Sequence, residues 1–127
     1  MSTTLAQQRA AFSLAQLETV GCQKDFKGFS AGLPALILQN GFGQTLAFLL
    51  AKAKNRNLAD KHYAALKIIL AWLVECNLLP AGNEKMQIME ISQMDQMSYL
   101  HAQRETLAML EWLKRYANAD LFMENQA

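Results

Sequence analysis

The sequence predicts an all-α fold, a single-domain compact bundle of about six helices. Ala, Leu, Gln, Met, Lys and Glu are abundant, whereas Val, Ile and Thr are sparse, and this bias favours helices over strands. No run of four to eight residues alternates cleanly between apolar and polar side chains, as a half-buried strand would. The 127 residues suffice to bury one hydrophobic core without covalent or metal cross-links.

The first half of the chain should contain three helices. We expect the first to begin after a cap at Ser2 or Thr3 and to end at about Lys27, before a turn over residues 28–32. Pro34 should then lie in the first turn of the second helix, because that turn needs no N–H donor and proline already has a suitable φ. Residues 1–3 and 120–127 are expected to be frayed ends of the single domain spanning 1–127.

A helix break at Asn40-Gly41 interrupts the most hydrophobic segment of the chain. Both residues tolerate the left-handed conformation that ends many helices, and Gly43 allows a third helix, residues 44–54, to start at once. Phe42 is either buried under this corner or exposed as a contact residue, and we expect burial.

The second half should also contain three helices. Asn57 and Asp60 resemble a capping box for a helix that ends at about Cys76 and is apolar on nearly every side, so it belongs in the core or at a shared interface. We expect the core. A loop over residues 79–83 precedes helices at 84–94 and 95–117, and four methionines near their junction are expected to fill core space rather than line an adaptable groove. These are Met86, Met89, Met94 and Met97.

Composition excludes several classes of protein. Charged residues make up 18% and hydrophobic residues 52%, which argues against disorder. Cys22 and Cys76 are too few and too widely spaced for a disulfide scaffold or a zinc framework, and are expected to be reduced, packed thiols. No stretch has the composition of a membrane span or signal peptide, so we expect a cytoplasmic protein.

Charge is distributed unevenly along the chain. Residues 20–70 carry seven cations and two anions, whereas residues 71–127 carry four cations and eight anions. The basic middle could contact phosphates, and the acidic end could contact a basic surface, including the basic middle of another copy. Solvated helix faces are the alternative explanation.

A search for catalytic motifs gives one weak match. The chain lacks GxxxxGK[ST], HExxH and GxSxG motifs, and Gly41-Phe42-Gly43 follows a helix rather than the strand that a dinucleotide site requires. We therefore expect no cofactor, no metal and no small-molecule substrate. Arg56 and His62 do fit the Arg-x(4–6)-His pattern of the helical HEPN ribonucleases, in which the His acts on the 2′-hydroxyl proton and the Arg steadies the phosphate, usually across a dimer.

A cluster of five cations is the stronger functional signal. The cluster spans 16 residues that contain a single anion, Asp60, and its members are predicted to bind RNA: Lys52, Lys54, Arg56, Lys61 and Lys67. Lys61 and Lys67 are six residues apart, so they need not share a helix face. Such a patch contacts phosphates and carries no base specificity. A helix-turn-helix protein, in which a recognition helix enters the DNA major groove, is disfavoured because the candidate second helix is too apolar.

Two segments carry a family resemblance. LPALILQNGFGQTLAFLLAK, residues 33–52, and YLHAQRETLAMLEWLKRYA, residues 99–117, together with their spacing and the all-helical pattern, resemble the small subunit of the Cmr effector complex. That complex is the type III-B CRISPR RNA-guided interference machine, and the resemblance covers most of the domain.

The resemblance implies a non-catalytic subunit with a role in antiviral defence. Several copies would stack beside the backbone subunits that carry the guide RNA and would line the path of the target RNA. The expected partners are those backbone subunits, further copies of this chain, and the guide or target RNA backbone. The alternatives are a purely structural adaptor between proteins without RNA contact, and the HEPN-like ribonuclease that would use Arg56 and His62.

Overall fold

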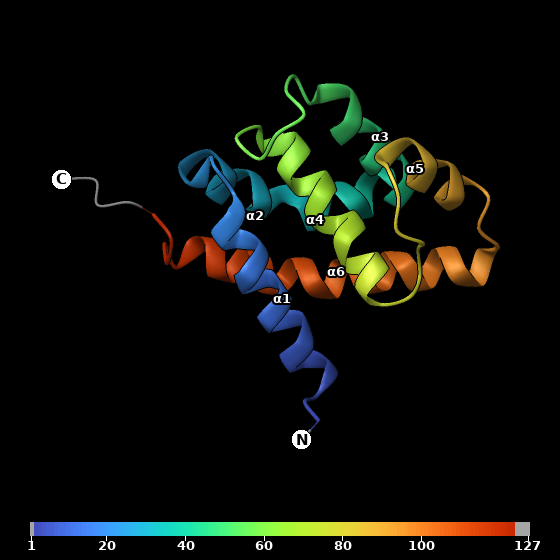
Figure 1. The fold of residues 1–127 in the computed structure, drawn as a ribbon, viewed down its shortest axis with the longest axis horizontal. Coiled ribbons are helices and arrows are strands. Elements are labelled where there is room, and N and C mark those ends of the chain that lie inside the picture. Colours follow the sequence, from blue (N-terminus) through green and yellow to red (C-terminus); the bar gives the residue numbers. More distant parts are fainter. Residues whose placement is uncertain (1, 124–127) are drawn as a thin grey trace.

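The computed structural model describes residues 2–123, and within that range it contains six helices and no strand, which confirms the all-α class. The helices are α1 (Leu5–Thr19), α2 (Gln23–Asn40), α3 (Phe42–Lys52), α4 (Lys61–Glu75), α5 (Glu84–Ser92) and α6 (Gln96–Asn118) (Figure 1). Residue 1 and residues 124–127, part of the ends predicted to fray, lie outside the described range.

The longest helix, α6, supports three others. Its 23 residues span about 35 Å. In Figure 1 it runs along the lower edge of the molecule, with α1 crossing it and α4 in the middle. Helices α1, α2 and α4 pack against α6, whereas α3 packs on α4 and carries α5. The first residues of α1 are exposed and extend beyond this support.

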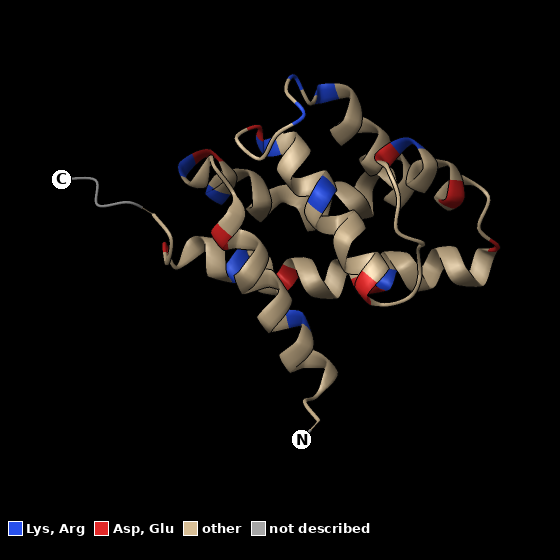
Figure 2. Cartoon of the chain, in the orientation of Figure 1, with Lys and Arg blue, Asp and Glu red and all other residues tan. Residues whose placement is uncertain are grey.

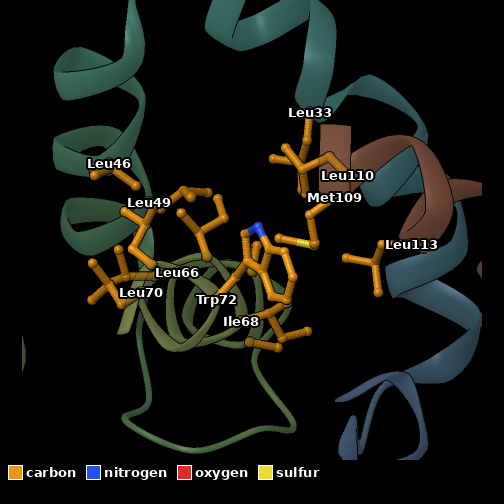
Figure 3. Packing of buried hydrophobic residues seen from close by; sticks show 14 of the residues in the cluster. Leu33, Leu46, Leu49, Leu66, Ile68, Leu70, Trp72, Met109, Leu110 and Leu113 are labelled. Atoms are coloured by element: carbon orange, nitrogen blue, oxygen red, sulfur yellow. The ribbon is translucent and has the colours of Figure 1, made fainter. Parts of the chain in front are cut away.

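Helix α4 lies at the centre of the core. Nine of its 15 residues are buried, as its apolar side chains on nearly every face predicted. Figure 3 shows Leu46 and Leu49 of α3 on one side of α4, and Met109 and Leu113 of α6 on the other. The core therefore has two halves that meet at this helix.

The predicted turn at residues 28–32 is wrong, because α2 runs through it. The first helix ends at Thr19 instead of Lys27, its cap is Thr4, and the turn to α2 lies at residues 20–22. Packing explains the difference, since one stripe of α2 is buried against its neighbours: Phe26, Ser30, Leu33 and Ile37. This burial outweighs the cost of two interior glycines and keeps Pro34 inside a helix.

The corner at residues 40–43 is present, with a geometry that only glycine adopts readily. Gly41 has φ 90° and ψ 158°, which is an extended mirror-image conformation rather than the left-handed helical one. Its N–H donates to Ile37 O at 2.7 Å, and α3 begins immediately, two residues earlier than predicted. Phe42 is fully buried, as expected.

Gly43 allows a close approach by Tyr99 of α6. The Gly43 N–H donates to the Tyr99 hydroxyl at 2.7 Å, and a Cβ at this position would lie 3.0 Å from the same oxygen. The ring of Tyr99 also packs edge-on against Phe42, with centroids 5.7 Å apart. The two glycines of the corner therefore have different roles, one conformational and one steric.

The expectation that the methionines fill the core is wrong for three of the four. Met97 is 78% exposed, Met89 is 52% exposed and Met86 is 39% exposed, while Met94 packs partly against the core. Helix α5 has nine residues and buries only Gln87 and Ile91, so most of its surface stays open to solvent. Because α5 is this short, Met97 near the start of α6 stays exposed.

Candidate nucleic-acid interface

Four of the five predicted cations gather where α3 leads into α4. Lys52 ends α3, Lys54 and Arg56 lie in the following loop, and all three are exposed. Lys61 is the first residue of α4 and is half-buried. We call these four residues the basic corner, and Figure 2 shows the blue segments of this loop at the upper edge of the molecule.

The fifth cation, Lys67, has different surroundings. Its side chain lines a hollow with Phe12, Gln16 and Val74, between α1 and α4. The spacing of six residues from Lys61 already left the shared face open. The structure places Lys67 in this hollow, while its charge acts, together with that of Arg56, on Glu84.

The loop that carries Lys54 and Arg56 is organised by the carboxylate of Asp60. One oxygen accepts from the backbone N–H groups of Lys54, at 2.8 Å, and Asn55, at 3.2 Å. The other caps α4 by accepting from His62 and Tyr63 at 2.9 and 3.1 Å. Asp60, rather than the predicted Asn57, is therefore the helix cap, and one side chain fixes both the loop and the helix start.

The same carboxylate stays ionised beside the cations. Burial tends to raise the pKa of Asp60, but the four backbone donors outweigh it and hold the pKa below its ordinary value. Its side chain is only 9% exposed. The Asp60 carboxylate is thus engaged by four backbone N–H groups, whereas the positively charged side chains of Lys52, Lys54 and Arg56 are exposed.

The turn between α1 and α2 supports the loop from the other side. Gly21 N–H donates to Leu58 O at 2.8 Å, and a Cβ on Gly21 would lie 3.4 Å from Ala59 Cα. The absence of a side chain at Gly21 thus allows close contact with this loop.

His62 is packed among aromatic rings beside the basic corner. Its ring lies edge-on to Phe29 of α2, with centroids 4.8 Å apart, and to Phe48 of α3, with centroids 5.9 Å apart. Burial lowers the pKa of His62, Lys61 and Lys52 lower it further, and Asp60, 3.7 Å away, opposes them. The imidazole is therefore mostly neutral at pH 7.

Arg56 has different neighbours from His62. It lines a hollow with Glu84, Lys85 and Ile88, at the junction of the loop and α5. Glu84 there accepts a hydrogen bond from the Tyr63 hydroxyl, which lowers the Glu84 pKa, and the positive charges of Lys67 and Arg56 also contribute. The charges that act on the His62 pKa are those of Asp60, Lys61 and Lys52. Within one chain, Arg56 and His62 therefore lie among different neighbours.

Two other features bear on function. Within residues 2–123, no group of three or more His, Cys, Asp and Glu side chains is placed to hold a metal ion. No helix in the same described range is both long enough and apolar enough to cross a membrane.

Comparison with protein families gives one match. The family described as CRISPR-associated protein (Cas_Cmr5) matches residues 5–120, a range that includes all six helices. The chain belongs to this family. Membership confirms the resemblance carried by residues 33–52 and 99–117, and makes the protein a structural subunit of the CRISPR Cmr effector complex, in the small-subunit family of type III-B.

In this Cas_Cmr5 protein, sequence analysis missed a buried polar cluster that joins three helices. Arg9 of α1 donates from Nε and Nη2 to the two carboxylate oxygens of Glu105 on α6, at 3.0 and 2.6 Å. Trp72 Nε1 of α4 donates to Glu105 at 3.2 Å. The hydrogen bond from Arg9 lowers the Glu105 pKa despite burial. Arg9 and Glu105 are 96 residues apart, so no local pattern signals the pair.

Proposed function

We propose that this subunit is non-catalytic and contacts RNA phosphates through the basic corner. Several copies would lie beside the guide-RNA-carrying backbone of the complex and line the target RNA path, in the cytoplasm, as part of antiviral defence. The observation that carries this proposal is the exposed cationic surface on a loop whose only acid is engaged by four backbone N–H groups. Within a family of RNA-guided complexes, RNA is the polyanion such a surface would meet.

The chemistry of the corner suits a polymer read by its backbone. Lys52, Lys54 and Arg56 carry exposed positive charges at the end of α3 and in the loop, an arrangement suited to phosphates rather than to base edges. Contacts of this type release counterions, so the affinity falls steeply with salt and varies little with RNA sequence. That behaviour fits a subunit that accompanies many different target RNAs.

The surroundings of Arg56 and His62 support the non-catalytic part of the proposal. The ribonuclease pattern requires Arg56 and His62 to act on the same phosphate, yet Arg56 lies beside Glu84 and His62 lies between Phe29 and Phe48. Intact RNA after long incubation with the purified protein is the expected result. Cleavage that disappears in His62→Ala would overturn it.

The direct test is charge reversal at three residues, Lys52, Lys54 and Arg56, each to Glu. We expect RNA binding to be abolished while the helical circular dichroism spectrum stays unchanged. If each of the three cations neutralises one phosphate of a single strand, together they contribute about two units to the slope of log K against log salt in the unmodified chain. Unchanged binding by this variant would reject the basic corner.

A matched control puts the same charge change elsewhere. Arg104, Lys114 and Arg115 all lie on α6, and each would be changed to Glu. If the basic corner is the contact, the control loses only the modest affinity expected from a lower net charge. Equal losses in both triple variants would mean that overall charge, not the basic corner, determines binding.

A structural adaptor without RNA contact is the second candidate, and the exposed side chains at the α5–α6 end favour it. Met89, Met97 and Leu100 are all more than 40% exposed. This candidate predicts no RNA affinity in isolation but firm docking to another Cmr subunit. Purification of a tagged chain from its native host, with identification of bound proteins and RNA, separates the two candidates.

A further inference from the structure

Three aromatic rings from three helices form one partly exposed cluster next to the basic corner. Phe29 comes from α2, Phe48 from α3 and His62 from α4, and the His62 ring contacts both of the others. Phe48 is 38% exposed, which is high for a phenylalanine, and Phe29 and His62 are half-buried. We call these three residues the aromatic platform.

Cations lie on two sides of the platform. Lys52 follows Phe48 by four residues on α3, so the two side chains share a helix face. Lys61 lies over the Phe29 ring, with Nζ 5.6 Å from its centroid. Lys52 and Lys61 also both act on the His62 pKa, which places their charges close to the imidazole. The platform is therefore an apolar surface between two positive charges.

Phe48 also lines a small hollow at the surface. It has a volume of about 290 Å³ and is lined by Leu36, Asn40, Gln44, Thr45 and Phe48. The amides of Asn40 and Gln44 can each donate and accept hydrogen bonds. Planar apolar surface, adaptable polar groups and flanking cations are the combination that single-stranded nucleic acid requires.

We propose that the aromatic platform stacks an unpaired RNA base on Phe48, while Lys52 and Lys61 hold the phosphates on either side of it. His62, supported by Phe29, positions the Phe48 ring. This assignment deepens the proposed function and rests on it, because it adds base contact to a surface otherwise expected to bind phosphates alone. Stacking tolerates any base, so the site would not select a sequence.

Charge favours RNA over a protein as the occupant. A protein that docked an apolar segment on Phe48 would have to place acidic groups against Lys52 and Lys61 in fixed positions. A nucleic acid strand carries one phosphate per nucleotide, so it places negative groups near Lys52 and Lys61 whichever nucleotide stacks on Phe48. Asp60, the acid whose charge acts on His62, is engaged by four backbone donors, which partly offset its repulsion of the strand.

The test compares two RNA probes with the same number of phosphates. One is a short fluorescent oligouridine and the other is the same strand with abasic sugars, each titrated at low salt with the full chain by fluorescence anisotropy. The Phe48→Leu variant keeps an apolar side chain against His62 but removes the ring. Phe48→Tyr keeps the ring, and Trp112→Leu is the matched control, because Trp112 is half-buried and pairs with another aromatic residue, Tyr116, on α6.

If the platform stacks a base, Phe48→Leu weakens oligouridine binding by at least about fivefold, the lower limit for loss of one stacked base. The same variant leaves abasic binding unchanged, and Phe48→Tyr and Trp112→Leu both bind as the unmodified chain does. Equal affinity of the unmodified chain for both probes would refute stacking while leaving the phosphate contact intact.

Other outcomes identify the part of the reasoning that fails. Binding to neither probe would overturn the proposed function together with the platform. Unchanged RNA binding by Phe48→Leu, combined with loss of co-purifying Cmr subunits, would assign the platform to a protein contact and overturn its role as a base-stacking site.

Discussion

Replacement of Asp60 by Ala should destabilise the chain and release the loop of the basic corner. The carboxylate accepts four backbone hydrogen bonds, two from the loop and two from the first turn of α4. Ala removes all four acceptor contacts at once. Loss of a helix cap costs about 1 kcal/mol. The loop N–H groups of Lys54 and Asn55 lie at exposed positions where water can replace the acceptor, so each loses only about 0.5 kcal/mol.

The expected change in the free energy of unfolding is therefore about 2 kcal/mol. For a chain of 127 residues, that lowers Tm by about 8 °C. Urea unfolding followed by circular dichroism measures the first quantity, and thermal unfolding the second. Asp95→Ala is the control, because Asp95 caps α6 through Ser98 but holds no loop. It should cost less than Asp60→Ala.

The stability difference between the unmodified chain and Asp60→Ala should also depend on pH. The Asp60 pKa is held below its ordinary value, so its stabilisation is fully present above the unfolded pKa of about 3.9 and is lost as pH falls through the lower folded pKa. The unmodified chain and Asp60→Ala should thus converge in stability in acid. A loss at pH 7 below about 0.5 kcal/mol, or one that persists unchanged in acid, would refute the role assigned to the carboxylate.

Three further predictions test the corner, the buried cluster and a thiol. Gly41→Ala should lower the free energy of unfolding in urea by about 1–3 kcal/mol, because Gly41 has a positive φ that alanine adopts poorly. Gly28→Ala, inside α2 with open space around it, should be neutral or stabilising. Equal effects of the two substitutions would contradict the conformational role of Gly41. Arg9→Ala should lower the free energy of unfolding by about 2 kcal/mol at pH 7, which is less than the loss expected for a fully buried ion pair because Arg9 is partly exposed. The loss should be smaller in acid, where Glu105 is protonated. A loss that does not change with pH would argue against the ion pair. Burial raises the pKa of Cys76 to about 11, so iodoacetamide at pH 8 should modify it about 100-fold more slowly than in urea, and equal rates would contradict that environment.

How much of the site could be predicted from sequence depends on the range of the interactions involved. Lys52, Lys54 and Arg56 are close in the chain, so their charge cluster is visible in the sequence, and the structure leaves all three exposed. Their loop is ordered by Asp60, which is still a local contact. The platform is different, because Phe29, Phe48 and His62 come together only when α2, α3 and α4 pack. No pattern within one helix predicts that meeting.

The sequence by itself determined the all-α class, the family resemblance, the corner at Asn40-Gly41 and the central place of α4. The family resemblance rests on the likeness of residues 33–52 and 99–117 to the family's sequences. The other three follow from local backbone preference or from the apolar periodicity of one segment. Only the tertiary structure decided that α2 continues through residues 28–32, that Lys67 lines a hollow between α1 and α4, and that Arg9 reaches Glu105. These outcomes depend on burial against distant segments, whose free energy exceeds the local preferences that a sequence pattern records.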